Sequence, residues 1–269
     1  MSFKHMMFKK QIVRQLFWGL FALSVLTFSL GISWQVSKVN NFFYSFWYQT
    51  LDIHQIIDKS VPRNTQGKGD FPINDIELHE KKFADIVDAI HQHGVGLAEI
   101  TYVNKQLNSR KLLTISEVQH LQDVANLLDN ISHYWWGNLF FLLSLAIFYC
   151  WQVKNHAGSP VQQLRIASFR EMPTSKQKVI TVLALMLSVV VLLASLGFTQ
   201  IFYYLHTVVF PLDHQWFFYY KESLMATLMK APDIFAAIAL QLLLVALVIA
   251  VSIDAVISRY QRKNKAKLA

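Results

Sequence analysis

Cysteine, proline and glycine are scarce in this chain, with one, six and nine residues among 269. The single cysteine, Cys150, excludes a disulfide within the chain. The sequence also lacks the G-x-S-x-G turn that presents a nucleophilic serine in many hydrolases. Hydrophobic content is the dominant feature that remains. Hydrophobic residues make up 54% of the chain and the mean hydropathy is +0.31, which is too apolar for an ordinary soluble domain.

Charge is missing from three long apolar runs and nearly missing from a fourth. The runs cover 16–36, 134–153, 179–205 and 235–257, and Asp254 is their only charged residue. A helix of about 20 apolar residues crosses the roughly 30 Å core of a bilayer. Lipid offers no water to backbone amides, so each run must be a helix. The sequence therefore predicts an all-α polytopic membrane protein with four transmembrane helices.

The segments outside these runs differ in their content of lysine and arginine. Segments 1–15, 154–178 and 258–269 together hold 14 basic residues and one acidic residue, whereas 37–133 and 206–234 hold 11 basic and 15 acidic residues. The positive-inside rule then places both termini in the cytoplasm, with the protein crossing the cytoplasmic (inner) membrane several times. The net charge of +8 reflects this topology and contact with lipid headgroups, and nucleic acid is not an expected partner.

The first apolar run follows a basic leader, as a signal peptide would. At 21 residues, 16–36 exceeds the usual signal core of about 7 to 15 residues, and no convincing small-residue cleavage site follows it. We expect a retained helix. Cys150 then lies near the cytoplasmic end of the second helix, which disfavours a cysteine nucleophile acting on the outer face.

The long outward segment, 37–133, is predicted to form a helical extracytoplasmic cap. Residues 75–93 and 116–129 show apolar residues at helical spacing, and 58–72 is rich in proline and glycine and is expected to be a loop. The shorter outward segment, 206–234, is aromatic and is expected to dip into the membrane interface like a re-entrant loop.

Two histidines lie where predicted membrane helices meet the outer water, and histidine exchanges protons near neutral pH. His120 shares a helix face with Asp123, three residues on, and a neighbouring carboxylate can fix the tautomer of an imidazole. From the spacing alone, a solvated polar face of an outer helix is the better explanation of this pair. His206 ends a run of 27 residues without charge. It is either a functional group at the membrane edge or an interfacial side chain that reaches water.

Metal chemistry is the weaker interpretation of these residues. Their side chains suit zinc, but no H-x-x-x-H or H-E-x-x-H spacing is found, and His91 and His93 fit no ligand template. We expect neither a bound metal nor another cofactor. A metal-dependent lipid hydrolase remains one alternative, and a non-catalytic membrane sensor or scaffold with a ligand-binding outer domain is the other.

At these two segments the chain resembles the bacterial lipoprotein intramolecular transacylase family. The resemblance covers 112–128 and 199–235, which is 54 of 269 residues. The matching positions are Glu117, His120, Asp123 and Val124, then His206, Phe210, Asp213 and Trp216, and finally Pro232 and Phe235. The chain departs from the family pattern at Leu121, Ala125 and Leu205.

The resemblance implies a reaction and assigns roles. Family members are membrane-bound acyltransferases that move an acyl chain from the sn-2 position of the diacylglyceryl-cysteine of a lipoprotein to its N-terminal amine, giving the lyso-form. The implied partners are membrane lipids and a diacylated lipoprotein substrate. The amine has a pKa of about 7.7 to 8.0 and needs a base. His120 and His206 are the expected catalytic residues. Supporting roles are expected for Asp123, Tyr204, Asp213 and Trp216.

Overall fold

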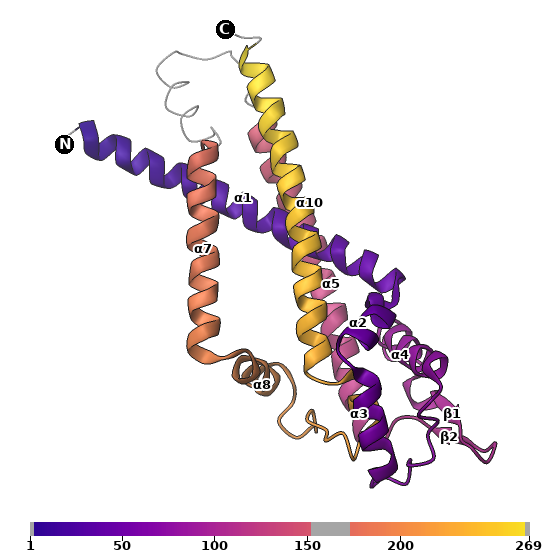
Figure 1. Cartoon of the computed structure of the whole chain (residues 1–269). Coiled ribbons are helices and arrows are strands. Elements are labelled where there is room, and N and C mark those ends of the chain that lie inside the picture. The colour runs from indigo at the N-terminus through magenta and orange to yellow at the C-terminus, as the bar shows by residue number, and fades with distance from the viewer. Residues whose placement is uncertain (1–2, 152–172, 267–269) are drawn as a thin grey trace. The chain divides into compact units, whose positions relative to one another are not determined.

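The computed structural model describes residues 3–151 and 173–266, and nearly all of its regular structure is helical (Figure 1). Two compact units are present. The first, here called the spanning unit, comprises 1–33, 134–195 and 243–269. The second, here called the cap unit, comprises the remaining residues, 34–133 and 196–242.

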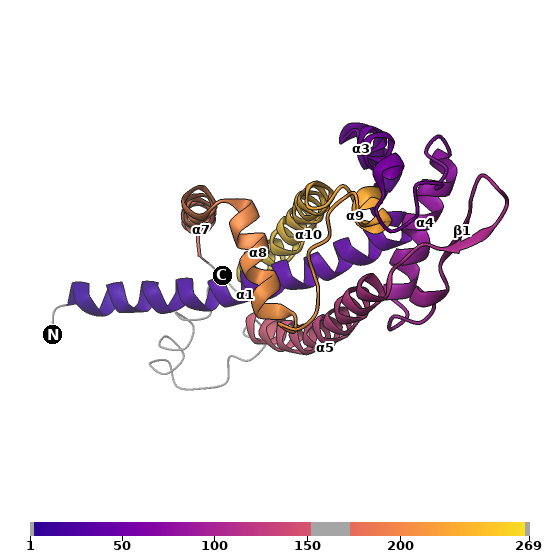
Figure 2. The same cartoon turned by 90° about the horizontal axis from the view of Figure 1, so that it is seen from below.

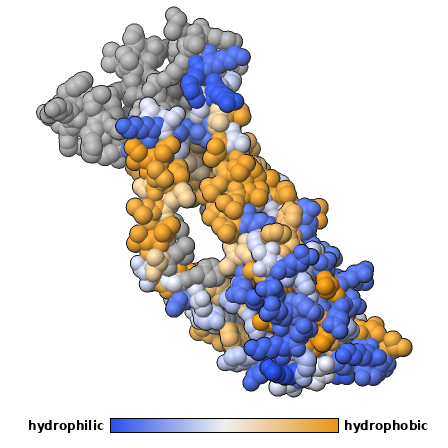
Figure 3. Space-filling model, viewed as in Figure 1, coloured by the Kyte–Doolittle hydropathy of each residue, from blue (hydrophilic) through white to orange (hydrophobic). Residues whose placement is uncertain are grey.

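Long helices supply the spanning unit. They are α1 (Phe3–Val39), the second half of α5 (Ile115–Trp151), α7 (Ser175–Leu196) and most of α10 (Asp233–Ala266). Exposed leucine, isoleucine and valine side chains cover α7 and α10, as the apolar colouring of Figure 3 shows. Such surfaces are stable only against lipid or protein.

Among the described residues, three helices are long and apolar enough to cross a membrane: Gln15–Val39, Ser175–Leu196 and Asp233–Tyr260. They overlap the predicted runs 16–36, 179–205 and 235–257. The fourth predicted run, 134–153, is helical as far as Trp151, where the described part of α5 ends. Residues 152–172, which include most of the predicted cytoplasmic loop 154–178, lie outside the described residues.

Close packing and polar bonds join the helices of the spanning unit. Gly31 of α1 approaches the Trp135 ring so closely that a Cβ there would lie 1.9 Å from the indole nitrogen. Lys178 of α7 forms an ion pair with Asp254 of α10 at 2.7 Å, and the Trp18 indole donates to the same carboxylate at 3.2 Å. The one charge in the predicted runs therefore faces partner helices.

The predicted third helix, 179–205, is two helices in the structure. α7 ends at Leu196 and α8 covers Phe198–Val209, with Gly197 between them at φ 77° and ψ 141°. Only glycine adopts this backbone geometry without strain, so the helix stops there although the flanking residues remain apolar. The prediction of a continuous helix was wrong at this residue.

The cap unit is mostly helical, and its helices are short. They are α2 (Tyr44–Thr50), α3 (Ile53–Ser60), α4 (Ile76–Ile90), α8, α9 (Leu224–Met229) and the 3₁₀ turns Asn41–Phe43, Val61–Arg63 and Leu97–Glu99, and the first half of the long helix α5 also belongs to this unit. The predicted helix 75–93 is confirmed as α4, with the Asp75 carboxylate accepting from the Leu78 amide at its start. The predicted loop 58–72 begins later than expected, because α3 continues to Ser60.

An antiparallel hairpin corrects the expectation of a purely helical cap. Strands β1 (Thr101–Val103) and β2 (Ser109–Lys111) pair with Thr101 opposite Lys111, and Figure 2 shows them on the same side of the cap unit as α4. Each strand has three residues. Hydrophobic periodicity does not reveal elements so short.

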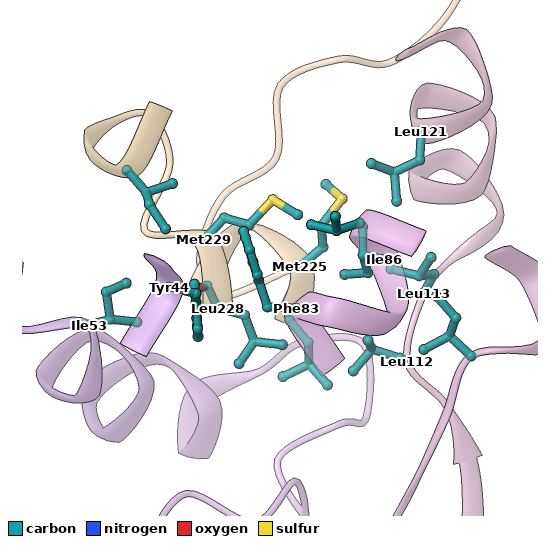
Figure 4. Packing of buried hydrophobic residues seen from close by; sticks show 14 of the residues in the cluster. Tyr44, Ile53, Phe83, Ile86, Leu112, Leu113, Leu121, Met225, Leu228 and Met229 are labelled. Atoms are coloured by element: carbon teal, nitrogen blue, oxygen red, sulfur yellow. The ribbon is translucent and has the colours of Figure 1, made fainter. Parts of the chain in front are cut away.

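The core of the cap unit forms where α2, α4 and α9 meet (Figure 4). Phe83 of α4 stacks on Tyr44 of α2 with ring centroids 4.1 Å apart. The Tyr44 hydroxyl donates to the Leu228 carbonyl of α9 at 2.7 Å, so this buried phenol keeps its hydrogen bond. All six residues of α9 are buried. The core thus packs the two segments of the cap unit, 34–133 and 196–242, against each other.

Candidate functional site

The helix that carries His120 begins at a reciprocal cap. The Glu117 amide donates to Thr114 Oγ1 at 3.3 Å, and the Thr114 amide donates to Glu117 Oε2 at 2.5 Å. This pattern fixes the first turn of a helix. The predicted helix 116–129 is confirmed as the start of α5, which continues without a break into the apolar segment that ends at Trp151.

Glu117 also anchors a second part of the cap unit. The Ser223 hydroxyl donates to its carboxylate, and Ser223 in turn caps α9 by accepting from the Ala226 amide at 2.8 Å. Lys68 Nζ lies 3.9 Å from Glu117 Oε2 and donates to the Leu112 carbonyl at 2.6 Å. Glu117 is fully buried and Lys68 is 8% exposed, so the charges neutralise each other in the core.

His206 lies on α8 and has a defined tautomer. Its Nδ1 is 2.8 Å from the Phe202 carbonyl oxygen, one turn earlier. A carbonyl only accepts hydrogen bonds, so Nδ1 carries the proton. Burial lowers the pKa of His206 and favours the neutral ring. The neutral ring then presents Nε2 as a proton acceptor.

The two predicted catalytic histidines come together. The ring centroids of His120 and His206 are 6.2 Å apart, although 86 residues separate them in the chain. Three aromatic side chains from the segment after α8 surround them. Phe210 lies 5.1 Å from the His120 ring and 5.2 Å from the His206 ring, Trp216 lies 5.0 Å from His206, and Phe218 lies 5.9 Å from His120.

The electrostatics of the pair favour the neutral, unprotonated rings. Burial, then the neighbouring His206, lower the pKa of His120 to about 4. Its Nδ1 is buried and has no hydrogen-bond partner among the described residues. A buried polar atom without a partner costs free energy, so its retention indicates a group kept for binding or chemistry.

Asp123 has a different partner from the one predicted. Its Oδ2 accepts a hydrogen bond from His214 Nδ1 at 2.6 Å, and this bond raises the pKa of His214. The expectation that Asp123 orients His120 by a hydrogen bond was wrong. Spacing along a helix places Asp123 on the face of His120, but the loop after α8 brings a second histidine closer to the carboxylate.

The other predicted supporting residues differ in their placement. Trp216 contacts His206 as expected from its position in the motif. Asp213 is exposed, and Tyr204 is 68% exposed on the face of α8 that turns away from His206. Its neighbour Tyr203 packs on Trp216 with ring centroids 5.6 Å apart.

The sequence interpretation missed several members of the site. They are Tyr203, Phe218 and, as the partner of Asp123, His214, while Phe210 matched the family pattern but was given no role. The helical period provides a signal for Tyr203, which is three residues before His206, and Phe210 is four residues after it. Among the described residues no group of three or more histidine, cysteine, aspartate or glutamate side chains is arranged to hold a metal ion.

Comparisons with known proteins agree with the resemblance seen in the sequence. A family model described as "Lipoprotein intramolecular transacylase Lit" matches residues 18–235. A solved structure of the membrane integral lipoprotein intramolecular transacylase Lit from Bacillus cereus is similar, with a TM-score of 0.55 and 17% identity over 100% of both chains. At that identity the structural likeness concerns the fold. No curated protein matches the chain.

Proposed function

The chain belongs to the lipoprotein intramolecular transacylase (Lit) family, and on this premise we propose that it converts diacylated lipoproteins to the lyso-form. The acyl chain leaves the sn-2 oxygen of the diacylglyceryl-cysteine and joins the α-amine of the same cysteine. The substrate class is a bacterial lipoprotein with a free N-terminal amine, embedded in the membrane by its lipid.

The approach of His120 and His206 is the observation that supports this chemistry most. The buried imidazole of His120 and the half-buried imidazole of His206 lie with their ring centroids 6.2 Å apart in an aromatic setting, and both have a lowered pKa. The reaction needs a proton removed from an ammonium or amine and a proton returned to an alkoxide. Neutral imidazoles perform both transfers near neutral pH.

The balance of the step is internal to the substrate. The amine nitrogen attacks the sn-2 ester carbonyl, an N–C bond forms, and the C–O bond to glycerol breaks. His206 Nε2 accepts the amine proton, since Nδ1 is engaged with the Phe202 carbonyl. The leaving glyceryl oxygen receives a proton through His120 or from the protonated His206. Both reacting groups belong to one molecule, so positioning lowers much of the barrier.

The proposed setting is the outer face of the cytoplasmic membrane. We infer four spans, 16–36, 134–153, 179–205 with its break at Gly197, and 235–257, with both termini cytoplasmic. The excess of basic residues in the cytoplasmic segments supports this topology. The apolar helices of the spanning unit agree with a location in the membrane.

Mass spectrometry of lipoprotein N-termini tests the reaction. The protein is expressed in a host whose lipoproteins keep a free α-amine on the diacylglyceryl cysteine. We expect the total lipopeptide mass to stay constant while fragmentation shows one acyl chain on nitrogen and one on glycerol. His120→Ala and His206→Ala should each prevent the shift.

His93→Ala is a matched control for these variants. His93 is an exposed cap-unit histidine that bonds Asp129 of α5 at 2.7 Å and does not touch the His120–His206 pair, so it should leave the shift intact. An unchanged fragmentation pattern with well-expressed wild-type protein would favour the sensor or scaffold. Loss of one acyl mass would favour a lipid hydrolase.

Labelling of single cysteines tests the topology. In a chain with Cys150 replaced, Glu77→Cys should react with a membrane-impermeant thiol reagent in intact cells. Ser175→Cys should react only after the cells are opened. Both positions are exposed in the structure, so differences in reactivity report the side of the membrane. Protection of position 77 in intact cells would contradict the inferred orientation.

A further inference from the structure

The segment from Phe210 to Phe218, here called the aromatic loop, follows α8 and supplies Phe210, Trp216 and Phe218 to the two histidines. Little regular structure supports it. Among the described residues, the only backbone hydrogen bond within Pro211–Phe218 runs from the His214 amide to the Pro211 carbonyl, at 3.2 Å. A segment with so few backbone bonds depends on its side chains to keep one conformation.

His214 is the side chain that ties this loop to α5. Its bond to Asp123 measures 2.6 Å, and the two side chains are 23% and 14% exposed. The bond is charge-assisted, because the carboxylate raises the pKa of the imidazole and so favours the cation. Among the described residues, no other polar side-chain bond joins 211–218 to α5.

His214 lies at the middle of the loop, where one bond restricts the whole segment most. It lies four residues after Phe210, four before Phe218 and two before Trp216, so the bond fixes the centre of the segment. The two ends are held separately: α8 ends just before Phe210, and the buried bond from Ser223 to Glu117 follows Phe218.

We propose that His214 is a positioning residue: through Asp123 it holds the aromatic loop closed against α5, so that the loop frames the space between His120 and His206. This inference rests on the proposed function for its consequence, since the framed space is where the acyl transfer takes place. His214 acts through Asp123 and does not take part in proton transfer.

The bond also accounts for the charge on Asp123. A free carboxylate one turn from His120 would favour the imidazolium, yet the pKa of His120 is lowered. Pairing with His214 offsets the carboxylate charge beside the site. Burial and the neighbouring His206 keep His120 neutral, and the bond to His214 adds a counter-charge to the one carboxylate that opposes them.

Amide hydrogen exchange of the full chain in lipid nanodiscs tests the loop without reference to activity. We expect His214→Ala to speed exchange at the two hydrogen-bonded amides of the loop, those at positions 210 and 214, by about tenfold, the size expected for losing one charge-assisted hydrogen bond. His214→Asn keeps a donor near the position of Nδ1 and should restore most of the protection. His93→Ala removes a similar bond to α5 at Asp129 and should leave exchange in the loop unchanged.

Acyl transfer by the same variants tests the consequence. His214→Ala should lower turnover about tenfold, and His214→Asn should recover part of it. In the Asp123→Asn background, His214→Ala should add little, because each change removes the same bond. Exchange at positions 210 and 214 that is equal in wild type and His214→Ala would overturn the proposal, as would faster exchange with unchanged turnover. Faster exchange with no transfer by the wild type would reject the proposed function and leave the loop contact standing.

Discussion

Glu117 and His120 lie one turn apart on α5, and their polar atoms have opposite surroundings. The carboxylate of Glu117 is fully buried and bonded to Thr114, Ser223 and the nearby Lys68. His120 is 9% exposed, and its Nδ1 has no partner among the described residues. Aromatic rings surround it in place of hydrogen-bonding groups.

The difference separates a polar group that holds the fold from one available for chemistry. A buried carboxylate with every oxygen bonded stabilises the arrangement around it, and removing it leaves a buried cation unpaired. A buried imidazole with an unbonded nitrogen adds little to the stability of the fold. That nitrogen is instead available to a bound substrate. Substitution of Glu117 should therefore lower the stability of the protein, whereas substitution of His120 should lower its activity.

The largest effect is expected on substitution of His120. His120→Ala should reduce acyl transfer on the order of a thousandfold, within the range seen for loss of a general acid or base. The unfolding midpoint in detergent should change little. Single-turnover transfer from a diacylated lipopeptide measures the rate, and Gln119→Ala, exposed on the same turn, is the control. Equal losses of rate in His120→Ala and Gln119→Ala would contradict a specific catalytic role for His120.

Glu117→Gln should act in the reverse way. Lys68 then remains buried without its counter-charge, and we expect the free energy of unfolding to fall by about 3 to 5 kcal/mol. Adding Lys68→Met should recover most of the loss, because the uncompensated cation is removed. Chemical unfolding followed by tryptophan fluorescence measures both variants. A double variant as unstable as Glu117→Gln would show that the ion pair is not the cause.

Stability should also depend on pH through His120. Its pKa falls from 6.5 to about 4 on folding, so between these values the unfolded chain binds a proton that the folded chain does not. Stability therefore decreases as pH falls through this window, by at most about 3 kcal/mol for this group. His79 and His91 shift in the same direction, so wild type is compared with His120→Leu, whose pH dependence should be weaker.

The smallest effect distinguishes two adjacent tyrosines. Tyr203 packs against Trp216 with tilted rings, and Tyr203→Ala should lower transfer about tenfold, comparable to the loss of one aromatic pair. Tyr204 is exposed, and Tyr204→Ala should change the rate by no more than about twofold, as expected for surface positions. Steady-state transfer rates compare the two. A larger effect of Tyr204→Ala than of Tyr203→Ala would support the role that the sequence analysis assigned to Tyr204.

Sequence alone located the helices well where apolar length decides the structure. The runs 16–36 and 235–257 coincide with candidate spans because lipid burial needs no tertiary information. Gly197 was not recognised as a break, since it lies in a charge-free run where a glycine is tolerated in a helix. The hairpin at 101–111 was missed because its strands are too short to show a period of two.

The site was half visible in the sequence. His120 and His206 were identified from their residue type and the family resemblance, and the structure brings them together. The partner of Asp123 was not visible, because His214 is 91 residues away and local spacing pointed to His120. Tyr204 was chosen over Tyr203 although one residue on a helix turns the side chain by about 100°.

Gly197 has a consequence for how the protein can diverge. In an unbroken helix, every side chain on α8 would keep a fixed angle to those on α7, because each residue adds about 100° of rotation. The left-handed glycine interrupts that phase relation. A change of length within α7 would therefore not be passed on, through a continuous helix, as a rotation of the His206 side chain.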